Sequence, residues 1–302
     1  MTERAGDFFA FVRERYRIFL RRGEGQPWPW TEDPILRKYH FCNVFREDDK
    51  TTRWIRERIT EELSGPALLG ALLIARRINS IPSLEKLTAN TDLLHSWPGS
   101  LPLWAQEVRG LLKDQSPLTG RAYRVPTPNN RGLNKLEGLL WCFERDLPRT
   151  LKMQIELPRL NTLRRTAKRL QDLNHIGKFV AYEIATDLRH SLLREAPDIM
   201  TWACVGPGAV RGIGQCYHGD ADYYQVGTSR RPKPNPKYEA TYLTMVRELL
   251  QMSQDPTHWP QEWPAWEMRE VEHTLCEFDK YERARLGQGA PKQLYDGTRE
   301  AA

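Results

Sequence analysis

The sequence lacks any apolar run long enough to cross a membrane. Its longest, residues 67–75, is about half of the roughly 20 residues that a membrane-spanning helix needs. The first twenty residues carry charges, such as Arg4 and Glu14, within an apolar pattern that is typical of an amphipathic helix rather than a signal peptide. We therefore expect a cytoplasmic protein with no membrane partner.

Cysteine is also scarce, and the five residues form no Cys-x-x-Cys pair. An odd number without paired spacing argues against both a disulfide framework and a zinc knuckle. The sequence predicts reduced cysteines, mostly buried, as in cytosolic proteins. The five are Cys42, Cys142, Cys204, Cys216 and Cys276.

Four common catalytic motifs are missing from the sequence. It has no Gly-x-x-x-x-Gly-Lys-Ser/Thr loop, no Gly-x-Gly-x-x-Gly after a strand, no Gly-x-Ser-x-Gly and no His-Glu-x-x-His. These absences disfavour P-loop kinases, Rossmann oxidoreductases, serine hydrolases and zinc proteases.

What the sequence has is helical periodicity almost throughout, with no alternating strands and no internal repeat. We expect an all-α protein forming one helical domain over 1–302. It would begin with a helix in 1–25, contain a proline-rich basic loop at 228–236 and end in a frayed tail at 288–302. Asp33-Pro34 would open a second helix. Further helices are predicted at 51–63, 66–78, 132–143, 159–173, 177–193, 238–251 and 264–286.

The net charge of +6 suggests a polyanionic partner, although the distribution of charge matters more than its total. One basic cluster lies in a single helical stretch, and a second lies in the proline-broken loop. Both are candidates for DNA phosphate contacts, and both could instead be solvated surface. The first comprises Arg159, Arg164, Arg165, Lys168 and Arg169, and the second Arg230, Arg231, Lys233 and Lys237.

A Gly-Pro-Gly turn at Gly206 to Gly208 is the most informative local signal. An apolar stretch precedes it and a helix follows, which suggests a helix–Gly-Pro-Gly–helix element. Glycine leaves backbone N–H groups uncovered, and a helix N-terminus adds partial positive charge, so the turn could hold a DNA phosphate. Arg211, one turn into that helix, would reinforce the site. The alternative is an ordinary tight turn.

Two further segments hold candidate polar residues. On the helix at 177–193, Lys178, Tyr182 and Arg189 share a face. Glu183 and Asp187 lie one turn apart, so they could bind a divalent metal, divide acid and base roles, or form surface ion pairs. Arg76, Arg77 and Asn79 end an apolar helix, where Asn79 could be only the cap. Asp220, Asp222 and His218 are metal ligands or loop surface.

Five segments taken together resemble a helical, DNA-glycosylase-like family found in phage DNA hypermodification systems. The family includes the helical domain of 5-hydroxymethyluracil DNA kinases and the α-glutamyl/putrescinyl thymine pyrophosphorylases, which are amino-acid:DNA transferases. The likeness runs from about residue 28 to 283. The segments are Trp30–Leu36 with Tyr39–Arg46 and Asp49, Arg77–Asn79, Tyr182–Arg189, Asp198–Gly212 and Val271–Tyr281.

The resemblance implies a helix–hairpin–helix fold and, because the P-loop is missing, the transferase branch. Such an enzyme would replace the pyrophosphate of 5-(pyrophosphoryloxymethyl)uracil in double-stranded DNA with an amine from an amino acid or polyamine. The nucleotide would be flipped out. The protein would work in the cytoplasm of an infected bacterium beside other phage modification enzymes. No cofactor is assigned, and Mg²⁺ is the candidate if a metal assists.

The resemblance also implies residue roles. Arg77, Arg46 and Arg211 would stabilise departing pyrophosphate. Asp187 or Asp198 would accept the proton of the amine, with Glu272 and Glu277 as further choices. Asn43 and Asn79 would read the uracil edge. The substrate-binding set is completed by Lys178, Tyr182 and Lys280.

Two other functions stay open at this point. The chain could be a non-catalytic DNA-binding partner of a 5-hydroxymethyluracil DNA kinase, or a glycosylase that removes a modified base. Glycosylases of the helix–hairpin–helix type place a catalytic Asp well after the hairpin. With the hairpin at Gly206, Asp198 precedes it and Asp220 and Asp222 follow too closely, which disfavours base excision.

Overall fold

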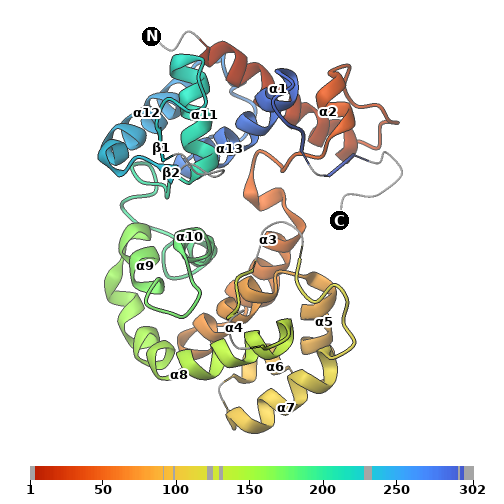
Figure 1. Ribbon diagram of the computed structural model, residues 1–302, viewed down its shortest axis with the longest axis vertical. Helices are drawn as coiled ribbons and strands as arrows, with labels where there is room; N and C mark the ends of the chain where they lie inside the picture. Colours follow the sequence, from red (N-terminus) through yellow and green to blue (C-terminus); the bar gives the residue numbers. More distant parts are fainter. Residues whose placement is uncertain are drawn as a thin grey trace. The chain divides into compact units, whose positions relative to one another are not determined.

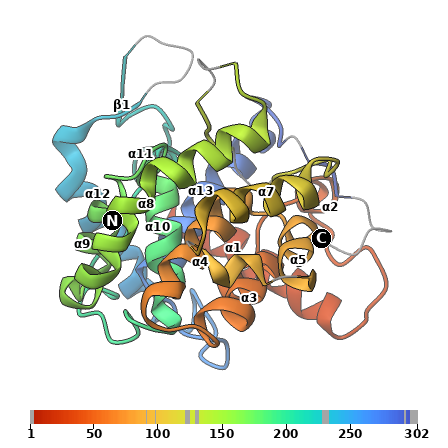
Figure 2. The ribbon, with the colours of Figure 1, turned by 90° about the horizontal axis from the view of Figure 1, so that it is seen from below.

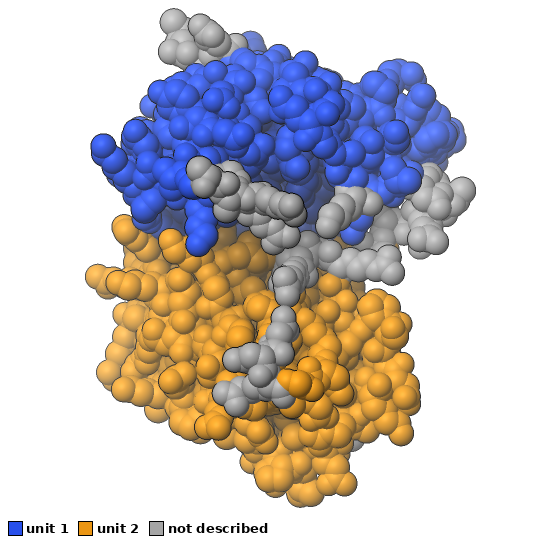
Figure 3. All heavy atoms as spheres, viewed as in Figure 1, with its two compact units in different colours: residues 1–49, 199–302 blue, residues 50–198 orange. Residues whose placement is uncertain are grey.

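A computed structural model describes residues 4–90, 92–97, 99–120, 125–128, 132–227, 233–291 and 293–295. The chain divides into two compact units (Figure 3). Unit 1 comprises residues 1–49 and 199–302, and unit 2 comprises residues 50–198. The expectation of one helical domain over the whole chain stays a prediction.

Unit 1 consists of helices from both ends of the chain and one small sheet (Figure 1). Its helices are α1 (Ala5–Gly23), α2 (Pro34–Lys38), η1 (Arg46–Asp48), α11 (Pro207–His218), η5 (Pro236–Tyr238), α12 (Glu239–Met252) and α13 (Met268–Arg285). Strands β1 (Gln225–Val226) and β2 (Lys233–Pro234) pair antiparallel, with Gln225 opposite Pro234.

The α11–α13 pair forms the centre of unit 1, because glycines let the two helices approach closely. A Cβ on Gly208 would overlap the Cys276 side chain, and one on Gly212 would overlap the Leu275 carbonyl. Helix α1 packs on the same pair through buried aromatic residues. Phe8 meets the ring of Phe278 edge-on at 5.6 Å.

Unit 2 is helical throughout its described residues. Its elements are α3 (Lys50–Ile55), the π-helical turn η2 (Arg56–Thr60), α4 (Gly65–Ile78), α5 (Ile81–Asn90), α6 (Leu93–Ser96), α7 (Leu101–Leu112), α8 (Lys135–Leu160), α9 (Leu163–Leu170), α10 (Lys178–Asp187) and η4 (Leu188–His190).

Helix α4 is the core of unit 2, and it contacts α5, α6, α8 and α10 (Figure 2). Every residue from Leu68 to Ser80 is buried. A helix that is apolar on all sides is expected to be buried, so the sequence of this helix explains its central place.

The predicted all-α class is confirmed, whereas several helix bounds differ from the expected ones. Helix α8 continues through Pro148 to Leu160, well beyond the predicted 132–143. Buried residues at helical spacing, including Phe143, Met153 and Leu157, outweigh the missing proline donor. No helix in the described ranges is long and apolar enough to cross a membrane.

Candidate functional site

A short turn joins α9 to α10 in unit 2. The Thr162 side chain caps α9 by accepting a hydrogen bond from the Arg165 N–H at 3.1 Å. Leu173 and Ile176 anchor the turn because both are buried. Gly177 precedes α10 in an extended conformation, and no side chain caps this helix end. The structure therefore contains a helix–turn–helix at 163–187, a place where the sequence predicted two unrelated helices.

A buried ion pair holds this turn. The Arg77 Nη2 donates to Asp146 Oδ2 at 2.5 Å and to the Asn174 carbonyl at 2.8 Å. The Asp146 Oδ1 accepts from the Asn174 backbone N–H at 2.8 Å and from its side-chain amide at 2.7 Å. Arg77 and Asp146 are 2% and 1% exposed. These contacts make Arg77 a positioning residue for the turn, while its expected role at pyrophosphate stays a prediction.

A second buried ion pair joins α4 to α10. The Arg76 guanidinium binds both carboxylate oxygens of Asp187, with Nε 2.6 Å from Oδ2, and lies 3.5 Å from Glu183. Asp187 is 2% exposed. The proposed surface pairing of Glu183 and Asp187 is wrong, because both carboxylates are buried against an arginine of another helix. Tyr182 is also buried, and Lys178 is exposed at the start of α10.

Asn79 ends α4 in the left-handed conformation, with φ of 49°. The capping interpretation is therefore confirmed. Its side-chain Oδ1 is buried without a hydrogen-bond partner among the described residues. A reading role at a uracil edge stays a prediction.

Three cations lie along the exposed side of α9, and we call them the basic α9 face. They are Arg164, Arg165 and Lys168. None of the three forms an ion pair within the described residues, whereas Arg169 binds Glu156 at 2.8 Å. Unpaired exposed cations beside a helix–turn–helix suit contact with DNA phosphates.

Asp198 caps the N-terminus of α9. Its two oxygens accept the backbone N–H groups of Leu163 and Arg164, both at 2.9 Å. Asp198 also follows the turn at 171–177 in the chain. The order argument against base excision assumed a hairpin at Gly206, so it does not apply to this turn.

The helix expected before Gly206 is absent, because residues 191–205 form turns and extended chain. The helix after it is present as α11, with Pro207 in its first turn. The Gly206 N–H donates to Glu272 Oε1 at 3.2 Å, so a carboxylate of the protein already occupies this helix end. The glycines at 208 and 212 serve the close packing of α11 on α13.

Arg211 is held by two carboxylates. Its Nε donates to Asp279 Oδ1 at 3.0 Å, and its Nη1 pairs with Asp222. Asp279 is buried, and Asp222 is exposed. Contact of Arg211 with DNA stays a prediction, and it would require exchange of these partners.

Segments far apart in the sequence meet in a buried polar cluster of unit 1. Glu277 accepts the Cys42 N–H at 3.1 Å and the Lys280 ammonium at 2.5 Å. Burial acts to raise the pKa of Glu277, but Lys280 and His273 outweigh it and lower the pKa. His273 also contacts the Asn43 carbonyl at 3.1 Å. Three predicted substrate-binding residues thus lie together, although Glu277 is committed to internal contacts.

The remaining predicted residues lie in different surroundings. Arg46 begins η1 and is half-buried. His218 stacks on Tyr223 at 3.7 Å and does not join Asp220 and Asp222 as a metal site. No group of three or more metal-ligating side chains occurs in the described part of the chain. The five cysteines are free, and Cys142 and Cys216 are buried. Arg230 and Arg231 lie outside the described residues.

Sequence reasoning missed the residues that hold these sites together. Asp146 and Asn174 carried no motif, because their meeting with Arg77 depends on the packing of α4 against α8. The spacing Leu170-x-x-Leu173-x-x-Ile176-Gly177 was a local signal for the turn. Apolar residues every three positions followed by glycine predict a short turn before a new helix.

Comparisons with known proteins agree with this architecture. A family model described as "5-hmdU DNA kinase, helical domain" matches residues 2–290. A curated relative, the 5-hmdU DNA kinase of Bacillus phage SP10, is 23% identical over 300 residues, covering 91% of this chain. The chain spans 44% of that relative's length. No solved structure matches.

Proposed function

Since the chain belongs to the family of helical domains of 5-hmdU DNA kinases, we propose that it modifies thymine-derived bases in phage DNA. We further propose that it replaces the pyrophosphate of 5-(pyrophosphoryloxymethyl)uracil with an amine. The observation that carries the DNA contact is the basic α9 face beside the turn at 171–177. We take this helix–turn–helix as the family's hairpin.

The reaction exchanges one bond at the 5-methylene carbon. The C–O bond to the bridging oxygen breaks, and its electron pair leaves with pyrophosphate. The amine lone pair forms the new C–N bond, and the amine loses one proton. Cations must stabilise the leaving group, and a base must take the proton.

Asp198 is the better of the two candidate bases. It is partly exposed, whereas Asp187 is 2% exposed and bound to Arg76. We assign proton acceptance to Asp198 and positioning to Asp187. Asp198→Asn keeps an oxygen that can cap α9, because Asn and Asp are about equal as N-caps. It should lower kcat by roughly 10²- to 10⁴-fold with little change in melting temperature. Activity within three-fold of wild type would remove Asp198 from the chemistry.

The reaction is tested with duplex DNA that contains 5-(pyrophosphoryloxymethyl)uracil, a pool of amino acids and polyamines, and nucleoside mass spectrometry. A nucleoside carrying an attached amine supports the transferase. Abasic sites would instead identify a glycosylase, which remains a required control because Asp198 follows the hairpin.

A second candidate function is presentation of DNA to a kinase. Two findings favour it: the matching family is the helical domain of a kinase, and the chain spans under half of its kinase relative. Under this alternative the chain binds DNA but leaves nucleosides unchanged, and it raises the rate of a separately supplied 5-hydroxymethyluracil DNA kinase.

A further inference from the structure

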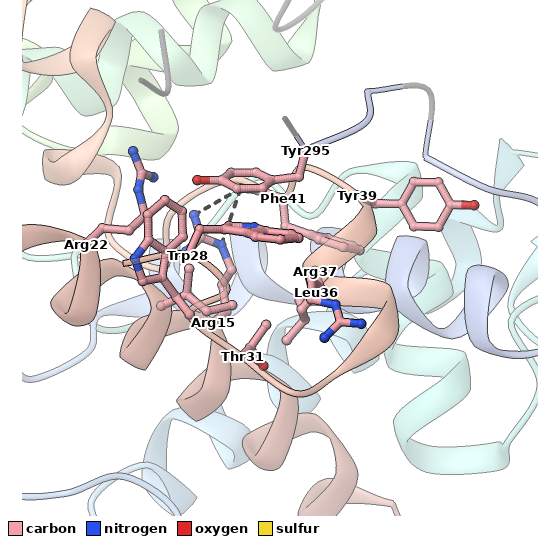
Figure 4. Close-up of a pocket in the computed structure, with 11 residues that line it drawn as sticks. Arg15, Arg22, Trp28, Thr31, Leu36, Arg37, Tyr39, Phe41 and Tyr295 are labelled. Carbon is pink, nitrogen blue, oxygen red and sulfur yellow. Dashed lines mark hydrogen bonds between the residues drawn. The ribbon is translucent and has the colours of Figure 1, made fainter. Parts of the chain in front are cut away.

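A pocket lies in unit 1 between α1, the following loop, α2 and residues 293–295 (Figure 4). Its empty volume, counted to the open mouth, is about 360 Å³. That value is at the lower end of the range for small-molecule sites. The lining residues that matter here are Arg15, Arg22, Trp28, Trp30, Tyr39 and Tyr295.

Tyr295 is fixed in the wall of this pocket by backbone contacts. Its N–H donates to the Lys38 carbonyl at 2.8 Å, and the His40 N–H donates to the Gln293 carbonyl at 3.0 Å. Leu294 and Tyr39 form an isolated β-bridge. The end of α2 and the segment 293–295 therefore hold the phenol ring over the pocket.

Two buried donors in the pocket have no partner. Arg15 is 6% exposed, and it uses Nε and Nη2 on the Phe41 carbonyl and Asn43 Oδ1. Its Nη1 is buried without a hydrogen bond, and so is the Tyr295 hydroxyl. A buried donor left unpaired costs roughly 1–3 kcal/mol, and more when it is charged. An anionic ligand would satisfy both groups.

The charge of the lining points the same way. Three arginines and no carboxylate line the pocket. Burial lowers the pKa of Arg15, which means that its positive charge is poorly compensated within the protein. Figure 4 shows Arg22 and Arg37 to either side of Arg15.

The aromatic residues identify the other half of the ligand. Trp28 is 47% exposed, and no ring stacks on it among the described residues. Trp30 meets Tyr295 edge-on at 5.6 Å and has Arg22 over its ring at 5.2 Å. Planar bases stack on such side chains, and arginine binds phosphate through paired donors.

We propose that this pocket binds one nucleotide, with its phosphate at Arg15 Nη1 and the Tyr295 hydroxyl and its base against Trp28. The nucleotide is either free or part of a DNA strand. In the second case the pocket would engage the DNA substrate of the proposed function. Binding of a free nucleotide tests the pocket independently of the amine-transfer reaction.

The test is isothermal titration calorimetry of the full chain with thymidine 5′-monophosphate, thymidine, inorganic phosphate and glutamate. A single-stranded oligonucleotide is titrated in parallel. The nucleotide should bind more tightly than thymidine or phosphate alone. Trp28→Ala and Tyr295→Phe should each weaken binding about ten-fold, through lost stacking and a lost hydrogen bond to a charged group. Neither change removes a packed partner of Arg15, so folding should persist.

Tyr223→Phe is the matched control, because Tyr223 is exposed in unit 1 and lies outside the pocket. It should bind like wild type. If only the oligonucleotide binds, and both pocket variants weaken it, the nucleotide comes from DNA. Equal affinities in wild type and both pocket variants for every ligand would overturn the proposal. Tighter binding of glutamate than of the nucleotide would overturn it as well.

Discussion

The buried Arg77–Asp146 pair offers the sharpest test of how unit 2 holds its turn. Asp146→Asn keeps the side-chain shape but removes the charge that compensates Arg77. It also places an amide opposite three donors: Arg77 Nη2 and the two N–H groups of Asn174. Breaking a buried pair while leaving one charge typically costs about 3–5 kcal/mol. That is a large share of a folding stability of about 5–15 kcal/mol.

The control is the exposed Arg109–Glu137 pair of the same unit, with Nε 2.7 Å from Oε1. Glu137→Gln should cost less than about 1 kcal/mol, because solvent screens exposed pairs. Urea unfolding followed by circular dichroism measures both variants, and hydrogen exchange over residues 163–187 localises the effect. Equal loss of stability in the two variants, or unchanged exchange in the turn, would refute the role assigned to the buried pair.

Three other predictions follow from the packing, the surface charge and the titration of the protein. Gly212→Ala should lower the unfolding free energy by about 1–3 kcal/mol, because its Cβ would overlap the Leu275 backbone. Gly110→Ala, in open space on α7, should instead stabilise by up to about 1 kcal/mol; a lower melting temperature for both would contradict this account. Replacing all three residues of the basic α9 face with Gln should reduce the slope of log affinity for duplex DNA against log salt by about 2.7. An unchanged slope would place DNA elsewhere. The pKa of Glu277 is lowered in the folded protein, so its stabilising contribution is present at neutral pH and is lost as the pH falls below its ordinary value of 4.5. Glu277→Gln should flatten the acid limb of stability against pH, and an unaltered limb would show that Glu277 contributes nothing there.

Helix content could be predicted from the sequence because it follows from local periodicity. The apolar run at 67–75 gave the buried α4, and Asp33-Pro34 gave the start of α2, where Asp33 accepts two backbone N–H groups. Helix ends were harder. Proline 148 suggested a break, but tertiary burial along α8 carried the helix through it.

The hairpin was misplaced because glycine has more than one structural use. At Gly206 to Gly212 the glycines were interpreted as freeing N–H groups for phosphate. In the structure they allow α11 to approach α13, and Glu272 already accepts the Gly206 N–H. At Gly177 the single glycine of the α9–α10 turn attracted less notice.

The candidate site could be predicted by residue but not by role. Arg77, Asn79 and Asp187 lie together in unit 2, and Asn43, Glu277 and Lys280 in unit 1. Their burial and internal partners could not be predicted, because Arg76, Asp146 and Arg15 reach them only through long-range packing. A single sequence holds no record of which charged residues meet across a core.

The central claim is that an amine replaces pyrophosphate on a DNA base. Its most direct test incubates the protein with 5-(pyrophosphoryloxymethyl)uracil DNA and an ¹⁵N-labelled amine pool, then measures labelled nucleosides and released pyrophosphate in the same sample. The account predicts a nucleoside that carries the label through a C–N bond, with one pyrophosphate released for each one formed. Pyrophosphate release without label in the nucleoside, or loss of the base, would contradict it.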